Sequence, residues 1–179
     1  MSDSVYESTY IADREYREIL ERTIQYQKLL DRILARIRAS VNLESLCTDT
    51  SQDMCWLLGI ERVAVYKFNE DWSGSFVNNF GFARTPWNDI RAFGENLIWE
   101  DTHLHKSQGG RFVKKECYSV TDVYEKGYPR CYIEVLEQFQ IRAYAVAPIF
   151  AGTKLWGLLA AYQHSQPRHW LADEVEFLH

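Results

Sequence analysis

The sequence has few cysteines, and none of its four cysteines forms a Cys-x-x-Cys pair. The spacing therefore gives no sign of a disulfide framework or a paired redox motif, and free thiols are the default in a reducing compartment. The chain also lacks any apolar run of membrane-spanning length, and its start, MSDSVYESTY, lacks the basic and apolar regions of a signal peptide. We therefore expect a cytoplasmic protein with no membrane insertion in this segment.

The sequence also has no excess of basic residues. The formal net charge is −5 at pH 7, and the lysines and arginines are dispersed along the chain. This distribution is not typical of proteins that bind nucleic acid or an anionic membrane, so neither partner is expected. Internal repeats and low-complexity segments are also absent, and 179 residues suffice for one ordinary domain with some extra length.

Aromatic residues, in contrast, are abundant. They make up 15% of the chain, with six tryptophans and eleven tyrosines. A small domain seldom needs this many aromatic side chains for its core. Some of them are therefore expected to line a pocket for a flat ligand.

The hydrophobic pattern divides the chain into three parts. Residues 1–12 are predicted to be disordered, and residues 13–41 form a linker or signalling helix. The apolar stripe of that helix is compatible either with a partner or with packing on its own domain. Residues 42–179 form the main domain, which begins with a helix over 43–58 that Gly59 ends.

In the rest of the main domain, the sequence pattern predicts two hairpins separated by a long irregular region. Strand residues alternate from residue 62, and the turn NEDWSG returns the chain as a second strand. Residues 83–130 have little periodicity and are typical of a functional loop region. A helix, a second hairpin around AGT and a last helix follow. This order predicts an α/β (α+β) fold in which helices cover one face of an antiparallel sheet.

The stretch YPRCYIEVLEQF places a cysteine at the start of an amphipathic helix. Its apolar residues recur with helical spacing, and Pro129 comes just before it. Cys131 therefore lies near a helix N-terminus, where a thiolate is stabilised and the sulfur becomes a better nucleophile. The alternative for an isolated cysteine is a buried structural residue.

Five stretches, in this order and at these spacings, resemble the bilin-binding GAF domains of the cyanobacteriochrome group, which are phytochrome-related photosensors. The stretches are RVAVYKFNEDWSGSFV, WEDTHLHKSQGGRF, VTDVYEKGYPRCYIEVLEQFQIRAYAVAPI, KLWGLLAAYQ and PRHW. The resemblance implies a GAF fold, an antiparallel sheet flanked by two helical layers. It also implies a linear tetrapyrrole in a cleft that the long insertion roofs.

The resemblance assigns Cys131 as the thioether anchor of the bilin. Some members use a second cysteine, but the loop motif that usually carries it is absent here, so Cys117 is not expected in that role. Cys47 and Cys55 lie on a predicted amphipathic helix and are expected to pack there.

The same resemblance assigns cofactor-binding roles to five further residues. Asp101, in a Trp-x-Asp pattern, would accept the ring N–H groups of the bilin, although an N-cap role is the alternative. Trp99 would stack on the far ring and His103 would lie in the pocket. Arg111 would clamp a propionate, and Tyr162 would hydrogen-bond the ligand. A surface arginine and a core tyrosine are the alternatives for these two.

A zinc site is the competing interpretation of this region. The Asp-x-His-x-His spacing that begins at Asp101 lacks the paired ligands of recognised zinc modules, so no metal is expected.

One residue departs from the family pattern, which usually has histidine directly after the anchoring cysteine. Here the residue is Tyr132, which keeps a flat face and a hydrogen-bond donor but loses an ionisable group. The same exchange occurs in some members that accept biliverdin as well as phycocyanobilin. The cofactor is therefore expected to be phycocyanobilin or biliverdin, and biliverdin would shift absorption toward the far-red.

The resemblance implies a photosensory input domain that is not itself an enzyme. Z/E isomerisation of the bilin D-ring would switch it between two states, red/green or far-red-shifted. The terminal helices would carry the change to an output module in cis, such as a histidine kinase, and they allow a homodimer. The alternatives are a GAF domain that binds a cyclic nucleotide or another small ligand, and a thiol redox sensor.

Overall fold

The computed structural model describes residues 2–39, 42–77, 80–90 and 102–179; side chains are not described for 2–12, 102 and 103. The chain divides into two units, 1–41 and 42–179. The first unit is one helix, α1, Ser2–Ala39. The sequence predicted disorder for residues 1–12, whereas the structure describes the backbone as helical from Ser2. Residues 1–41 contain neither proline nor glycine, so nothing in the sequence interrupts the helix.

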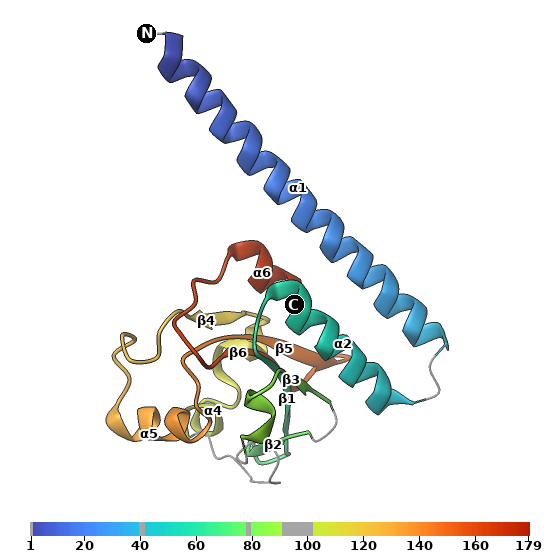
Figure 1. Ribbon diagram of the computed structural model, residues 1–179. Helices are drawn as coiled ribbons and strands as arrows, with labels where there is room; N and C mark the ends of the chain where they lie inside the picture. Colours follow the sequence, from blue (N-terminus) through green and yellow to red (C-terminus); the bar gives the residue numbers. More distant parts are fainter. Residues whose placement is uncertain (1, 40–41, 78–79, 91–101) are drawn as a thin grey trace. The chain divides into compact units, whose positions relative to one another are not determined.

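The second unit is built on an antiparallel sheet (Figure 1). Within the described residues it has six strands in the order β2-β1-β6-β5-β4, with β3 also paired to β1. The strands are β1 Arg62–Phe68, β2 Gly74–Phe76, β3 Phe82–Ala83, β4 Tyr118–Val120, β5 Ala143–Ala151 and β6 Lys154–Gln163. Both predicted hairpins, β1–β2 and β5–β6, are confirmed.

The helix α2, Leu43–Leu58, has the bounds that the sequence predicted. The side chain of Asn42 caps its start by accepting the N–H groups of Glu44 and Ser45 at 2.9 and 3.4 Å. Gly59 ends it in the left-handed conformation, with φ 63° and ψ 28°, where a glycine has no Cβ to clash. Only residues 59–61 separate α2 from β1.

The two faces of the sheet carry side chains of different size. Successive residues of a strand point to opposite faces. On the face covered by α2 and by α6, Ala172–Phe177, the central strands present small or branched side chains that are almost completely buried. These residues are Val63, Val65, Ala143, Ala145, Ala147 and Ala161. We call this the helix face.

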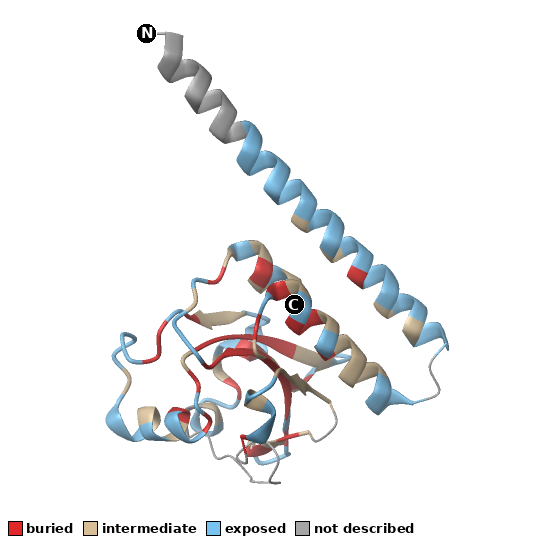
Figure 2. Ribbon diagram, in the orientation of Figure 1, coloured by how far each residue is buried: buried red, intermediate tan, exposed pale blue. Residues whose placement is uncertain are grey.

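The opposite face, which we call the cavity face, presents larger residues, most of them aromatic or branched. They are Tyr66, Phe68, Tyr144, Val146, Leu158 and Tyr162, and they too are buried (Figure 2). Burial on both sides means that both faces of the sheet are covered. This matches the two layers that the family resemblance implied and corrects the single helical layer expected from the element order.

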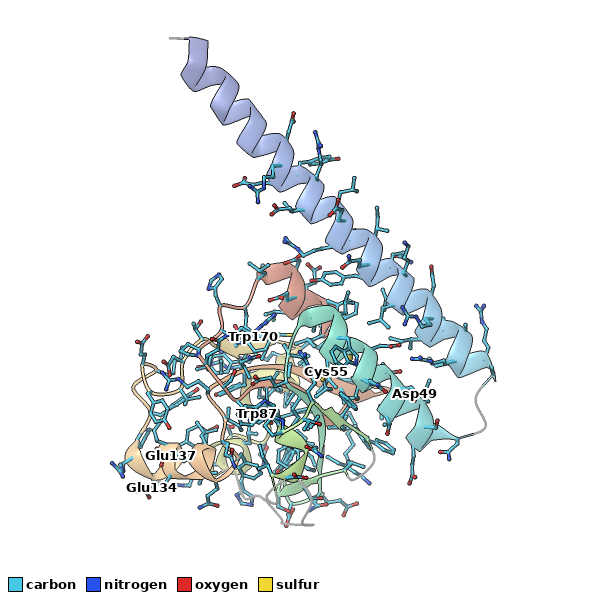
Figure 3. All side chains as sticks on the ribbon, in the orientation of Figure 1. Asp49, Cys55, Trp87, Glu134, Glu137 and Trp170 are labelled. Atoms are coloured by element: carbon cyan, nitrogen blue, oxygen red, sulfur yellow. The ribbon has the colours of Figure 1, made fainter. Side chains whose placement is uncertain are left out.

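The cavity face is covered by the long insertion and by the helix that follows it. The described insertion contains η1 Trp87–Asp89, α4 Thr102–Lys106, η2 Gly110–Lys114 and strand β4. The helix α5, Arg130–Gln138, buries Leu136, while Glu134 and Glu137 are exposed on its outer side (Figure 3). None of the helices among the described residues combines the length and apolarity needed to cross a membrane.

Candidate ligand cavity

A cavity of about 640 Å³ lies between the cavity face of the sheet, the insertion and α5. Small-molecule sites typically enclose roughly 300–1,000 Å³ and are lined mainly by apolar and aromatic side chains. The sheet supplies Tyr66, Phe76, Tyr144, Val146, Leu158, Ala160 and Tyr162. The insertion and α5 supply most of the other lining residues, including Leu104, Arg111, Phe112, Tyr118, Tyr128, Cys131, Tyr132 and Leu136. The lining thus suits a flat, largely apolar ligand with a few polar groups.

Cys131 is the exposed cysteine of the cavity lining, and it lies in the first turn of α5. The carbonyl of Pro129 accepts the N–H groups of Tyr132 and Ile133 at 3.0 and 3.1 Å, which fixes the start of the helix. The sulfur is therefore accessible both from solvent and from the cavity.

The other three thiols are partly or fully covered. Burial raises the pKa of Cys47 and of Cys117, and raises the pKa of Cys55 to about 12. Cys55 is completely buried, and its sulfur lies 3.8 Å from the carbonyl oxygen of Phe82. Burial therefore disfavours the thiolate form of these three groups. Cys47 and Cys55 lie on α2, the helix on which the sequence predicted that they pack.

Four tyrosines form one wall of the cavity, which we call the tyrosine wall: Tyr118, Tyr128, Tyr132 and Tyr144. The hydroxyl oxygens of Tyr128 and Tyr144 are 2.6 Å apart, and those of Tyr118 and Tyr128 are 3.4 Å apart. The rings of Tyr128 and Tyr132 meet edge to face, with centroids 4.9 Å apart.

Burial raises the pKa of both Tyr128 and Tyr144; hydrogen bonds with Tyr118 and Tyr144 raise the pKa of Tyr128 further, whereas the hydrogen bond with Tyr128 opposes the shift at Tyr144. Tyr128 and Tyr144 therefore stay neutral, and their hydroxyl groups can both donate and accept hydrogen bonds. Sequence reasoning identified Tyr132 but missed Tyr144. The available signal was its position as the large residue in the alternating stretch AYAVA of β5.

The rim of the cavity beside the tyrosine wall is cationic. The guanidinium carbon of Arg111 lies 4.1 Å from the centroid of the Tyr118 ring, and the ammonium of Lys126 lies 5.3 Å from the same centroid. Both side chains are exposed. A planar guanidinium held against an aromatic face keeps its N–H groups in a fixed fork, which suits a carboxylate. The rim is thus suited to an anionic group of a ligand.

Tyr162 lies at the end of the cavity face, where β1 begins and β6 ends. Burial raises the pKa of its hydroxyl, and the nearby Arg62 opposes that shift. Arg62 donates to the carbonyl of Trp87, and the Trp87 ring stacks on His164 with centroids 5.1 Å apart.

His164 is buried next to these groups, and its Nδ1 lies 2.9 Å from the carbonyl oxygen of Gln140. Because a carbonyl can only accept, Nδ1 carries the hydrogen. Burial lowers the pKa of His164 to about 4, so the ring is neutral at pH 7. The end of the cavity face is therefore polar but closely packed.

The cavity brings together four of the seven residues that the sequence indicated: Cys131, Tyr132, Arg111 and Tyr162. Trp99 and Asp101 lie outside the described residues. The backbone of His103 belongs to α4, but its side chain is also outside the described part of the chain.

A family model described as GAF domain matches residues 42–179. Several solved structures are similar as well. One is the far-red-absorbing dark state of JSC1_58120g3 with bound biliverdin IXα: identity is 39%, the TM-score is 0.73, and the match covers 84% of this chain and 90% of that chain. Another is the red-light-absorbing state of NpR6012g4, a red/green cyanobacteriochrome, with 45% identity, a TM-score of 0.65 and coverage of 73% and 82%. A third is the phycocyanobilin-bound GAF domain from a cyanobacterial phytochrome, with 30% identity, a TM-score of 0.70 and coverage of 85% and 86%.

Curated relatives include much longer proteins. A putative methyl-accepting chemotaxis protein of Synechocystis (sll0041) is 29% identical over 85% of this chain. The circadian input-output histidine kinase CikA of the same organism is 27% identical over 84% of it. The chain spans 15% and 22% of the lengths of these two proteins.

Proposed function

The chain belongs to the GAF domain family, and from that premise we propose that residues 42–179 form a photosensory input domain that binds a linear tetrapyrrole covalently through Cys131. The observation that carries the proposal is the exposed Cys131 sulfur at the edge of an aromatic cavity of about 640 Å³. A nucleophile that must reach a large flat ligand needs both this access and this space.

Cys131 would form a carbon–sulfur bond by addition across the exocyclic double bond of the bilin A-ring. The thiol proton ends on the neighbouring carbon, so no oxidant or reductant is required. A bound bilin would supply light absorption and Z/E isomerisation of its D-ring, and the side chains that line the cavity would hold it in position.

The charged and polar lining residues fit the other groups of a tetrapyrrole. Arg111 would bind a propionate, with Lys126 adding positive charge beside the same tyrosine ring. Tyr162 would hydrogen-bond the ligand. From the family pattern we also propose Asp101 as acceptor of the ring N–H groups, Trp99 as a stacking residue and His103 as a pocket residue.

The proposed cofactor is phycocyanobilin or biliverdin. The similar structures include one with bound biliverdin and one with phycocyanobilin. Tyr132, in place of the usual histidine, favours biliverdin as an accepted ligand and a far-red-shifted colour; a red/green photocycle is the alternative. Next to Cys131, the tyrosine wall provides an aromatic surface and hydroxyl groups that can contact the bound bilin.

The proposed partners are a signalling module in the same chain and a second copy of the protein. The similarity to a histidine kinase and to a chemotaxis protein supports a sensor that regulates an output module. The helix α1 has exposed apolar residues spaced along its length, among them Tyr16, Ile19, Leu30 and Ile37. Such a helix suits a homodimer, and a cytoplasmic setting suits a kinase output.

The test is coexpression with the enzymes of bilin synthesis, followed by absorption spectra before and after red illumination. Zinc-induced fluorescence in a denaturing gel then reports covalent attachment. We expect Cys131→Ala to abolish the fluorescent band and Cys117→Ala, the control, to retain it. A band of full intensity from Cys131→Ala would reassign the anchor, and a colourless wild type would favour a GAF domain for another small ligand.

A further inference from the structure

The turn between β1 and β2 holds a tryptophan in an unfavourable backbone conformation. Trp72 has φ 66°, a left-handed value that bulky residues rarely adopt. The turn is closed by hydrogen bonds from the N–H of Asn69 to the carbonyl of Ser73 at 2.7 Å and from the N–H of Trp72 to the carbonyl of Asn69 at 3.2 Å. The carboxylate of Asp71 accepts both the N–H and the hydroxyl of Ser73 at 3.0 and 2.6 Å. These hydrogen bonds hold the backbone conformation that sets the direction of the indole.

The indole lies between the sheet and the insertion. Its ring meets Phe68 of β1 edge to face at 5.5 Å. It also lies directly against the backbone of Gly109, where a Cβ would be 2.8 Å from Cζ3 of Trp72 and 2.9 Å from a methyl carbon of Leu155. Gly109 has φ 83°. Both the contact and the dihedral angle therefore require glycine at this position.

Gly109 in turn determines where η2 begins. Its N–H donates to the carbonyl of Leu104 at 2.9 Å, and its own carbonyl accepts the N–H of Phe112 at 3.1 Å. Gly110 and Arg111 lie between Gly109 and Phe112, and the Arg111 guanidinium lies 4.1 Å from the Tyr118 ring centroid on the cavity rim. The path from the indole to the guanidinium therefore runs through two residues of fixed backbone.

We propose that Trp72 is a positioning residue for carboxylate recognition: through Gly109 it holds η2, and hence the Arg111 guanidinium, at the rim of the cavity. The ligand class that this arrangement selects is a tetrapyrrole with ionised side-chain carboxylates, as opposed to the same ring system with neutral side chains. This inference rests on the proposed function, since it concerns the same cavity.

The first test needs no ligand. In the full-length apoprotein, NMR of the Arg111 side chain should show a ring-current shift from Tyr118. We expect Trp72→Ala to abolish most of this shift and Trp72→Phe, which keeps an aromatic ring, to retain it. Trp56→Ala is the matched control, because Trp56 is 58% exposed on α2 and contacts Arg84 instead. An unchanged Arg111 shift in a folded Trp72→Ala protein would overturn the proposal.

The second test compares biliverdin with its dimethyl ester in a Cys131→Ser background, in which binding is reversible. We expect the parent to bind the diacid about tenfold more tightly than the ester, a typical value for one charge-assisted contact. Trp72→Ala and Arg111→Ala should both reduce this ratio to about one while changing the Kd of the ester less than twofold.

The outcomes separate this inference from the proposed function. Equal weakening of diacid and ester by Trp72→Ala would indicate general loss of structure and overturn the positioning role. A diacid preference that survives in Trp72→Ala would do the same. A parent protein that binds neither compound would overturn the proposed function, and the Arg111 shift in the apoprotein would still decide whether Trp72 positions Arg111.

Discussion

The helix face and the cavity face of the sheet are made by the same strands but differ in how they are filled. On the helix face, Ala145 and Ala161 are paired across β5 and β6, and both are completely buried. On the cavity face, Tyr144 and Tyr162 occupy the neighbouring cross-strand pair, and they line a space of about 640 Å³. Small side chains let helices pack closely on one side, while large ones on the other side support the walls of a cavity.

Because of this difference, substitutions on the helix face should affect mainly stability, and substitutions on the cavity face should affect mainly ligand binding. Close-packed interiors lose stability when a side chain grows, because neighbouring atoms have no space to move into. The cavity face has free volume beside it, but it also holds buried polar groups that must stay neutral or hydrogen-bonded. The helix face should therefore be sensitive to volume, and the cavity face to charge, pH and ligand.

The largest expected effect on stability comes from acid and acts at the cavity face through His164. Its pKa is about 4 in the folded protein, compared with 6.5 ordinarily, so the unfolded chain takes up a proton first as the pH falls. The contribution of neutral His164 to the free energy of unfolding is complete above about pH 6.5. It is lost as the pH falls to about 4, by about 3 kcal/mol in total. Urea unfolding at pH 7 and pH 4.5 should show a smaller pH dependence for His164→Gln. The exposed His169→Gln is the control, and identical pH dependence of His164→Gln and wild type would contradict the assignment.

The next effect concerns ligand choice at Tyr132. If this tyrosine sets the position of the bilin A-ring beside the sulfur, Tyr132→His should lower biliverdin attachment and preserve phycocyanobilin attachment. A displacement of about 1 Å from the reactive geometry can cost roughly a hundredfold in rate. The covalently bound fraction after separate coexpression with each bilin measures this. Equal biliverdin yields would show that Tyr132 does not determine selectivity.

Adjacent alanines on β6 give the most direct comparison of the two faces. Ala161 lies on the helix face, whereas Ala160 lines the cavity. We expect Ala161→Leu to lower the free energy of unfolding by about 2 kcal/mol through overpacking. Ala160→Leu should cost clearly less, because its side chain can enter the cavity, but it should weaken ligand binding. Equal losses of stability in urea titrations would remove the distinction between the faces.

The smallest effect tests the hydroxyl groups of the tyrosine wall. Tyr144→Phe removes the 2.6 Å hydrogen bond to Tyr128 and should cost about 1 kcal/mol at pH 7. The pKa of Tyr144 is raised, so its contribution to stability is present below the ordinary value of about 10 and is lost as the pH rises above it. Tyr144→Phe should therefore lose less stability than wild type between pH 9 and pH 11. Tyr16→Phe, at an exposed position on α1, serves as control.

Much of the fold could be predicted because local signals agree with the tertiary structure. Asn42 and Gly59 mark the ends of α2, and the alternation in β1 and the AGT turn predict the two hairpins. Periodicity did not predict that both faces of the sheet are covered. The alanines and valines on the helix face have small side chains, and such residues occur both on buried and on partly exposed sheet faces.

Only some residues of the candidate site could be predicted from the sequence. Cys131 could be identified from its place at a helix start together with the family resemblance, and Arg111 from the resemblance. The alternation in β5 marks Tyr144 as a large residue of one sheet face, but it does not indicate the contact with Tyr128, and no pattern indicates the contact of Trp72 with Gly109. Such contacts depend on strand register and turn conformation, which residue spacing alone does not specify.

The three-residue link between α2 and β1 leaves the chain no slack. The N–H of Ile60 donates to the carbonyl of Cys55 at 3.1 Å, and the N–H of Glu61 donates to the carbonyl of Tyr162 at 3.1 Å. The carboxylate of Glu61 also accepts the N–H groups of His164 and Ser165. We therefore expect a displacement of β1 to be transmitted to the end of α2, because this short link is hydrogen-bonded at both of its last residues. Inserting glycines into the link is expected to uncouple the two elements while leaving each of them folded.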